Sequence, residues 1–366
     1  MSSTQRERYR PLGKEIAELL QEEGQHGSPF RRAFRRLGEA GIFGLPLPEE
    51  QGGGGFGAVA TVDAMEGLAL GCSDLGFLFA ASAHLWGSVM PLASHAAPNV
   101  VERFLPGLID GSLISSHGVT EPEAGSDVAA LTTRIEEHGD ELRVRGTKTY
   151  ITAAPIADLF IVYGRDSAGL RGVIIPGDTP GIEVRCQHKL GLDGAPMGEV
   201  RFDCRLPTDL ALGPAGAGMA MFHTALEWER IGIVAPLLGA MDRQLERSIR
   251  RARRRRQFGQ PIGRFQSVSN RIVDMKLRLD IGRMLVRRAA GLKEDGKRAP
   301  LEAAEAKLYV TEAFLASSMD AMRTHGAEAY LQDSEEARDL RDAAGGPFYS
   351  GTSDVQKNII ARFLGL

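Results

Sequence analysis

Three short segments of this 366-residue chain carry residue types that could do chemistry. In the first, from Val119 to Asp127, Thr120 and Ser126 offer hydroxyls and backbone N–H groups, and Gly125 lets the backbone approach a ligand closely. Such a loop suits a ring nitrogen or a carbonyl oxygen of a ligand. An ordinary turn at the end of a strand accounts for the same Glu-Pro and Gly-Ser-Asp composition without any ligand.

The second segment, Leu226-Glu227-Trp228-Glu229-Arg230-Ile231, supplies carboxylates, which can accept a proton at neutral pH where a hydroxyl cannot. The third, Gly351-Thr352-Ser353-Asp354, precedes an apolar-periodic stretch and is a typical helix N-cap. A capped helix N-terminus is also a polar site for a ligand. Both interpretations of the third segment can hold together.

Arginines crowd residues 250–256, where they occupy six of seven positions. A guanidinium binds two oxygens at once and is a natural partner for a diphosphate. A solvated helix end, favoured by the helix dipole, explains the cluster without a ligand. A docking patch for an acidic partner is the functional alternative. Nucleic-acid binding is disfavoured, because no aromatic residues interleave the cluster and the net charge is -3.

Composition excludes several classes of protein. Three widely spaced cysteines and sparse, scattered histidines predict reduced thiols and no metal site. Uninterrupted apolar runs stay well short of the roughly 20 residues that a membrane span needs, and residues 1–10 are polar. We therefore expect a cytoplasmic protein with no membrane partner.

The periodicity of apolar residues predicts two domains in the first 214 residues. Residues 1–114 are helical, with a loop rich in Gly and Pro from Leu45 to Gly57. Residues 115–214 are β-rich, because period-two alternation surrounds the turn pair Gly139-Asp140 and short apolar runs follow it.

The remaining residues, 215–366, return to helix. Three apolar stripes run through them, Pro300 suits a first helical turn, and Gly326 suits a helix end. The whole chain is therefore predicted to be α+β: an N-terminal helical domain, a middle β-barrel-like or β-sandwich domain, and a C-terminal antiparallel four-helix bundle.

Four motifs, in the correct order and spacing, resemble those of the flavin-dependent acyl-CoA dehydrogenases, and the resemblance covers essentially the whole chain. The four motifs are Val119–Asp127, with Glu123 in place of a glycine; Gly146–Thr152; Arg255–Ile262 with Phe265-Gln266; and Phe348–Gln356. A fifth segment, residues 323–330, departs from the family pattern: it keeps Gly326 but has Arg323 at a glutamine position and Ala327 at a glycine position.

The resemblance implies FAD as the cofactor and assigns residues to it. Residues near the isoalloxazine ring would be Val119, Thr120, Ser126, Tyr150 and Thr152, with Ser126 also facing substrate. Arg255, Gln257, Phe258 and Gln266 would reach the FAD of a neighbouring subunit, and Arg323, Gly326 and Ala327 would lie at the diphosphate of that same FAD. Thr352 and Asp354 would lie near the flavin or its ribityl chain, and Tyr349 and Gly351 would wall the substrate pocket.

Ser350 stands where most relatives carry their catalytic glutamate. It keeps the backbone N–H that would bind the thioester carbonyl, but it lacks the carboxylate. Glu229 aligns with the position from which isovaleryl- and long-chain-type relatives supply their base. We therefore predict that Glu229 is the base and that Arg230 holds the local charges; a surface or ion-paired role for Glu229 is the alternative.

The implied activity is FAD-dependent α,β-dehydrogenation of an acyl thioester on CoA or on an acyl carrier protein. A carboxylate would remove the α-proton as a hydride leaves for flavin N5. Two alternatives remain: a non-catalytic subunit of a mixed complex, which the serine at position 350 motivates, and a flavin oxidase or monooxygenase on the same fold. The resemblance also implies a homodimer or homotetramer and electron-transferring flavoprotein as the electron acceptor.

Overall fold

The computed structural model describes residues 2–22 and 28–366. Helices fill the N-terminal part: α1 (Ser2–Gln21), α2 (Pro29–Glu39), α3 (Ala58–Gly71), α4 (Leu75–His84), α5 (Met90–His95) and α6 (Pro98–Ile109). A π-helical turn, Leu85–Val89, joins α4 to α5. Short 3-10 turns lie at Ile42–Gly44, Glu49–Gln51, Val128–Ala130, Ala154–Ile156, Thr208–Leu210, Ile262–Arg264 and Gly326–Tyr330.

The continuous helical segment Leu75–His95 is the one candidate membrane span found among the described residues, judged by length and composition. Its mean hydropathy is 1.3, and 83% of its most apolar window is buried inside the protein. A helix that is apolar all round and covered on all sides is typical of a protein core. We interpret the segment as the central core helix.

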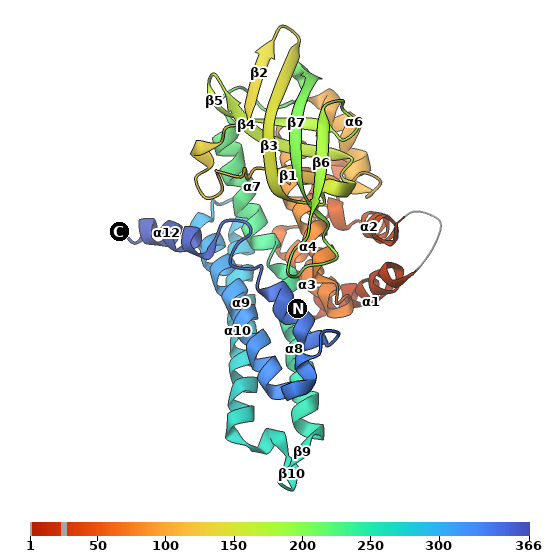
Figure 1. Cartoon of the computed structure of the whole chain (residues 1–366), viewed down its shortest axis with the longest axis vertical. Helices are drawn as coiled ribbons and strands as arrows, with labels where there is room; N and C mark the ends of the chain where they lie inside the picture. Colours follow the sequence, from red (N-terminus) through yellow and green to blue (C-terminus); the bar gives the residue numbers. More distant parts are fainter. Residues whose placement is uncertain (1, 23–27) are drawn as a thin grey trace.

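The middle part of the chain forms a mixed sheet (Figure 1). Its order is β6-β7-β3-β2-β4-β5-β8, and β1 pairs in parallel with β4. The predicted turn at Gly139 joins two antiparallel strands, and Gly139 has a φ of 62°. The strands are β1 (Ser115–Gly118), β2 (Arg134–His138), β3 (Glu141–Thr152), β4 (Leu159–Asp166), β5 (Gly169–Pro176), β6 (Ile182–Gln187), β7 (Met197–Pro207) and β8 (Ala211–Leu212).

A helical bundle follows the sheet and ends far from it in the short hairpin β9–β10 (Figure 1). Pro300 begins α10, and Gly326, with a φ of 72°, ends it, as predicted. The α+β architecture predicted from periodicity is confirmed. The elements are α7 (Gly218–Gly232), α8 (Ala235–Arg254), β9 (Arg256–Gln257), β10 (Gln260–Pro261), α9 (Gln266–Glu294), α10 (Pro300–His325), α11 (Glu335–Ala343) and α12 (Ser353–Phe363).

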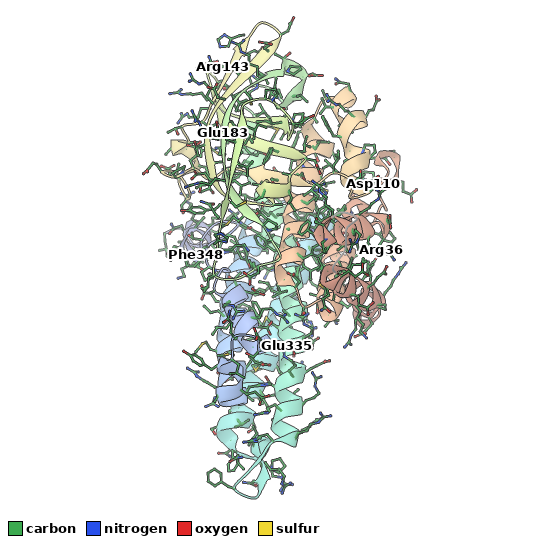
Figure 2. All side chains as sticks on the ribbon, turned by 45° about the vertical axis from the view of Figure 1, so that its right-hand side comes forward. Arg36, Asp110, Arg143, Glu183, Glu335 and Phe348 are labelled. Atoms are coloured by element: carbon green, nitrogen blue, oxygen red, sulfur yellow. The ribbon has the colours of Figure 1, made fainter. Side chains whose placement is uncertain are left out.

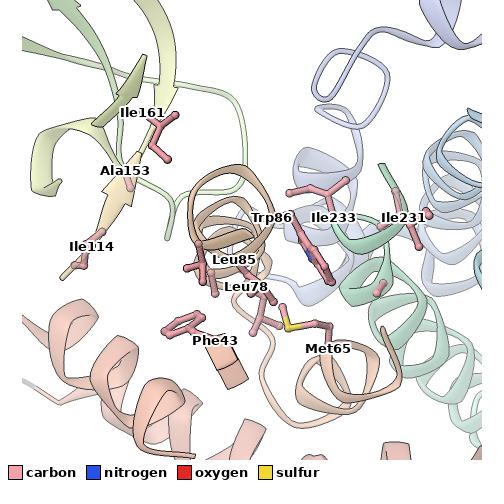
Figure 3. Close-up of a cluster of buried hydrophobic side chains, with 14 of the residues drawn as sticks. Phe43, Met65, Leu78, Leu85, Trp86, Ile114, Ala153, Ile161, Ile231 and Ile233 are labelled. Carbon is pink, nitrogen blue, oxygen red and sulfur yellow. The ribbon is translucent and has the colours of Figure 1, made fainter. Parts of the chain in front are cut away.

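Tight packing joins the N-terminal helices to α7 (Figure 3). The indoles of Trp86, in the π-helical turn, and Trp228, on α7, stack with ring centroids 5.5 Å apart. A Cβ added at Gly232 would lie 1.9 Å from the Trp86 indole, so only glycine fits there. Ile231 and Ile233 lie in the same buried cluster. This contact fixes α7, and with it Glu229, the residue that follows Trp228.

Candidate active site

A cavity of about 1220 Å³ lies where the sheet, α4, α7 and α12 meet. Many of the predicted site residues come together in its wall, and their roles stay a prediction. The predicted residues that line it are Val119, Thr120, Ser126, Tyr150, Thr152, Glu229, Arg230, Tyr349, Ser350, Gly351 and Thr352.

A buried ion pair holds the loop that follows β1. The Glu121 carboxylate accepts hydrogen bonds from the backbone N–H of Thr132 (2.6 Å) and Thr133 (2.8 Å) and from the Lys148 ammonium (2.9 Å). Lys148 also donates to the Val119 carbonyl at 2.7 Å. Both charged side chains are almost fully buried. The backbone of the predicted flavin loop is therefore fixed from inside the sheet.

This pair stays ionised at neutral pH. Burial raises the pKa of Glu121, but hydrogen bonds from Thr132, Thr133 and Lys148 outweigh it and lower the pKa to about 2. Burial lowers the pKa of Lys148 to about 8, against the opposing effect of Glu121.

Three hydroxyls in the cavity wall are available to a ligand. The hydroxyls of Thr120, Ser126 and Thr152 make no hydrogen bond with any residue that the structure describes. A register shift between Lys148 and Ile151 accompanies a φ of 59° at Tyr150, and this aromatic side chain lies 63% exposed in the cavity wall. Free hydroxyls beside an exposed aromatic ring fit the polar edge and the face of an isoalloxazine.

Glu229 faces this cavity from α7 with a side chain that is 13% exposed. Its Oε1 accepts a hydrogen bond of 2.6 Å from the Ser350 hydroxyl. Its Oε2 lies 3.7 Å from Nδ1 of His117 on β1. The glutamate is therefore neither on the surface nor in an ordinary ion pair with Arg230. By contrast, the neighbouring Glu227 is paired with Lys293 (3.3 Å) and lies 2% exposed.

The charges around Glu229 favour its ionised form. Burial raises the pKa of this carboxyl, but His117, Ser350 and Arg230 together outweigh burial, so the pKa lies below its ordinary value. An ionised carboxylate in a cavity wall is able to accept a proton.

The backbone at residues 350 and 351 is anchored by two side chains. Nε of Arg230 donates to the Ser350 carbonyl at 3.4 Å, and Nε2 of Gln356 donates to the same oxygen at 3.2 Å and to the Gly351 carbonyl at 2.9 Å. The Ser350 backbone N–H makes no hydrogen bond within the described part of the chain. This N–H can donate to a substrate carbonyl, and that role stays a prediction.

The residues on either side of Ser350 and Gly351 differ in their surroundings. Tyr349 packs on Phe79 of α4 at 4.7 Å between ring centroids and walls the cavity. Phe348, labelled in Figure 2, also lines the cavity but is 72% exposed. Thr352 caps α12 by accepting a hydrogen bond from the Val355 N–H at 3.2 Å. Asp354 does not line the cavity; it is 88% exposed and lies 3.5 Å from Lys357.

The residues predicted to reach a neighbouring subunit lie elsewhere. Phe258 lies 92% exposed at the β9–β10 hairpin, at the opposite end of the bundle from the sheet (Figure 1). None of the residues predicted for that role lines the described cavity, and their cofactor contacts stay a prediction. They are Arg255, Gln257, Phe258, Gln266, Arg323, Gly326 and Ala327.

Sequence reasoning missed His117 and Tyr163. The two rings pack edge to face at 5.5 Å, and burial together with the Glu229 charge raises the pKa of Tyr163. The available signal for His117 was its place at the end of a strand, three residues before Thr120. No sequence signal linked Tyr163 to Glu229.

Comparison with known proteins agrees with this geometry. Three family models match the chain: the acyl-CoA dehydrogenase N-terminal domain over residues 5–112, the middle domain over 116–204 and the C-terminal domain over 216–365. The chain belongs to the acyl-CoA dehydrogenase family.

The chain is similar to several relatives over nearly its whole length. It is 41% identical to an L-prolyl-[peptidyl-carrier protein] dehydrogenase of Pseudomonas fluorescens, covering 99% of this chain and 98% of the relative. The crystal structure of the prolyl acyl carrier protein oxidase AnaB has a TM-score of 0.93 and 38% identity, covering 100% of this chain and 99% of AnaB. The structure of PigA with FAD and proline has a TM-score of 0.94 and 32% identity, covering 100% of this chain and 97% of PigA.

Within this family the chain is an FAD-dependent oxidoreductase that dehydrogenates an acyl thioester at a CH–CH bond. The predicted fold, cofactor and reaction class are thus confirmed. The interpretation as a non-catalytic subunit also loses its motive, because Glu229 brings a carboxylate into the cavity that Ser350 lines.

Proposed function

We propose that the substrate is a cyclic aminoacyl group of the prolyl type, held as a thioester on a carrier protein. The observation that carries the proposal is the polarity beside Glu229. Nε2 of His117 and Oε2 of Glu229 are buried and make no hydrogen bond with the described residues. Unpaired buried polar atoms are costly, and a substrate ring nitrogen would pair with one of them. An unsubstituted alkyl chain would pair with neither, and the prolyl-carrier relatives support the same class.

In this proposal the Glu229 carboxylate removes the α-proton. Negative charge then develops on the thioester carbonyl, which accepts a hydrogen bond from the Ser350 backbone N–H. Arg230 and Gln356 keep that backbone in place through the Ser350 carbonyl. FAD, when bound, supplies the acceptor for the hydride.

Anaerobic mixing tests the substrate class. The purified, FAD-loaded protein is mixed with L-prolyl-carrier protein, with L-prolyl-CoA and with butyryl-CoA at equal concentrations. We expect the prolyl-carrier thioester to bleach the oxidised flavin fastest and to give a product lighter by two hydrogens. Equal or faster bleaching by butyryl-CoA would contradict the proposed substrate.

We also propose that the chain works as a homodimer or homotetramer in the cytoplasm. Four large side chains on α9 are exposed at spacings of four, four and three residues, which puts them along one face. An exposed apolar face of this kind often marks a protein–protein interface. These side chains are Val273, Leu277, Ile281 and Met284.

Electron-transferring flavoprotein is the electron acceptor that we propose, in line with the family resemblance. Dioxygen is the competing acceptor, because AnaB is named an oxidase. Reoxidation of the reduced protein by each acceptor, followed by the return of flavin colour, decides between them. Faster reoxidation by dioxygen would contradict the proposed acceptor.

A further inference from the structure

Ser350 has a backbone conformation that favours glycine. Its φ is 52°, and the φ of the following Gly351 is 84°. A residue with a Cβ is strained in this region, whereas glycine is not. A serine here therefore calls for an interaction that glycine could not make. The 2.6 Å hydrogen bond from its hydroxyl to Oε1 of Glu229 is such an interaction.

Side chains from two helices fix the backbone that carries this hydroxyl. The Ser350 carbonyl is held by Arg230 from α7 and by Gln356 from α12. Gln356 is fully buried and also holds the next carbonyl. These contacts fix the backbone of Ser350 beside Glu229, within hydrogen-bond reach of its carboxylate.

His117 lies beside the other oxygen of the same carboxylate. Its ring packs against Tyr163 at 5.5 Å and Phe222 at 6.5 Å between centroids. On a further side lies Gly87 of the π-helical turn, where an added Cβ would come within 3.1 Å of the ring. This packing keeps Nδ1 of His117 3.7 Å from Oε2 of Glu229.

We infer that Ser350 and His117 are positioning residues for Glu229: Ser350 holds Oε1 by a hydrogen bond, and His117 lies beside Oε2 without a hydrogen bond, so that Oε2 is left to accept the substrate proton. The inference rests on the proposed role of Glu229 as the base. It gives the serine at the family's usual glutamate position a function: it orients the base that replaces that glutamate. The other charged or titratable groups that face Glu229 are Arg230 of α7, Tyr163 of β4 and Lys307 of α10.

Two substitutions separate the hydroxyl from the backbone strain. Ser350→Ala removes the hydroxyl and keeps the strain, whereas Ser350→Gly removes both. Because the carboxylate is no longer held in its productive orientation, both variants should reduce flavin about 10- to 100-fold more slowly with L-prolyl-carrier protein, at unchanged KM. The acid limb of kcat should move to higher pH, because a hydrogen bond that favours the carboxylate is gone. Ser350→Gly should unfold at or above the wild-type temperature.

Ser353→Ala is the matched control. The Ser353 hydroxyl makes a hydrogen bond of the same 2.6 Å length to a carboxylate, but its partner is Glu312 on α10. This variant should keep the wild-type position of the acid limb, whatever it loses in stability. His117→Phe, which keeps a ring but removes the nitrogens, should move the limb in the same direction as Ser350→Ala.

A wild-type rate and an unmoved acid limb in Ser350→Gly would overturn the positioning role while leaving Glu229 as the base. A wild-type rate in Glu229→Gln would instead overturn the base itself. Crystal structures of the Ser350 variants supply a readout that needs no turnover. The Glu229 carboxylate should rotate away from its wild-type position in both, and an unchanged position would overturn the inference.

Discussion

Glu229 shows how a buried carboxylate can stay ionised. Its partners come from distant parts of the chain: His117 at the end of β1 and Ser350 in the turn before α12, with Arg230 beside it on α7. Each favours the charged form, and together they outweigh the cost of burial. The structure thus supplies the protonation state that a general base needs.

The lowered pKa of Glu229 predicts the pH dependence of the reaction. The carboxylate is the active form, so activity is present above the pKa and is lost as the pH falls through it. The acid limb of kcat/KM with L-prolyl-carrier protein should lie below the ordinary glutamate value of 4.5. Circular dichroism over the same pH range controls for unfolding. A limb above 4.5 in folded protein would contradict the proposed environment of Glu229.

For single residues, the sequence was informative only where the residue belonged to a recognisable motif. Glu229 could be predicted because a family resemblance placed it opposite the altered position 350. His117 was not predicted, because its place at the end of a short strand does not tie it to a glutamate 112 positions away in the chain. Its role depends on packing against Gly87 and Tyr163, which only the fold brings together.

Among the elements, the loop after β1 is held by a buried charge. Replacing Glu121 by glutamine removes one partner of its ion pair with Lys148, which predicts a loss of about 3 kcal/mol in the free energy of unfolding. FAD affinity should fall with it, because the loop lines the cavity. Thermal unfolding and equilibrium dialysis of FAD measure the two effects. Glu136→Gln, at a half-exposed side chain on β2, is the control.

The same pair predicts a pH window for stability. The pKa of Glu121 is lowered from 4.5 to about 2, so its contribution is present above 4.5 and is lost as the pH falls toward 2. The stability difference between the wild type and Glu121→Gln should therefore shrink across this window. A difference that stays constant would show that the charge of Glu121 is not what stabilises the loop.

The cap of α12 gives a second prediction for an element. Thr352→Ala removes the acceptor for the Val355 N–H and should cost about 1 kcal/mol of stability. FAD should bind more weakly too, because Thr352 lines the cavity. Thr352→Ser keeps the acceptor and should behave as the wild type. If Thr352→Ala binds FAD with unchanged affinity, the cap is structural only.

Regular elements followed from periodicity, whereas their irregularities did not. The turn at Gly139 and the ends of α10 were predicted from Gly and Pro positions. The positive φ at Tyr150 arises where the pairing of β3 with β7 shifts register, and a tyrosine gives no local sign of it. The π-helical turn that contains Trp86 packs against α7, and no local sequence pattern indicated it.

Across the whole molecule, the cavity is lined by residues from all three parts of the chain. The exposed α9 face and the hairpin with Phe258 lie away from this cavity and predict further contacts between copies of the chain. Leu277→Glu should lower the oligomeric state in light scattering, and the FAD content should fall with it. Phe56→Glu, at an exposed aromatic in the N-terminal part, is the matched control. Unchanged mass and FAD content in Leu277→Glu would contradict the proposed assembly.

The identity of the base is tested most directly by the rate of flavin reduction in Glu229→Gln. The variant is loaded with FAD to the wild-type level and mixed anaerobically with L-prolyl-carrier protein in a rapid-mixing instrument. Loss of a general base predicts a rate lower by roughly 10²- to 10⁴-fold. Adding Ser350→Glu to the variant should restore part of that rate, since a carboxylate returns to the cavity. A wild-type rate of flavin reduction in Glu229→Gln would contradict Glu229 as the base.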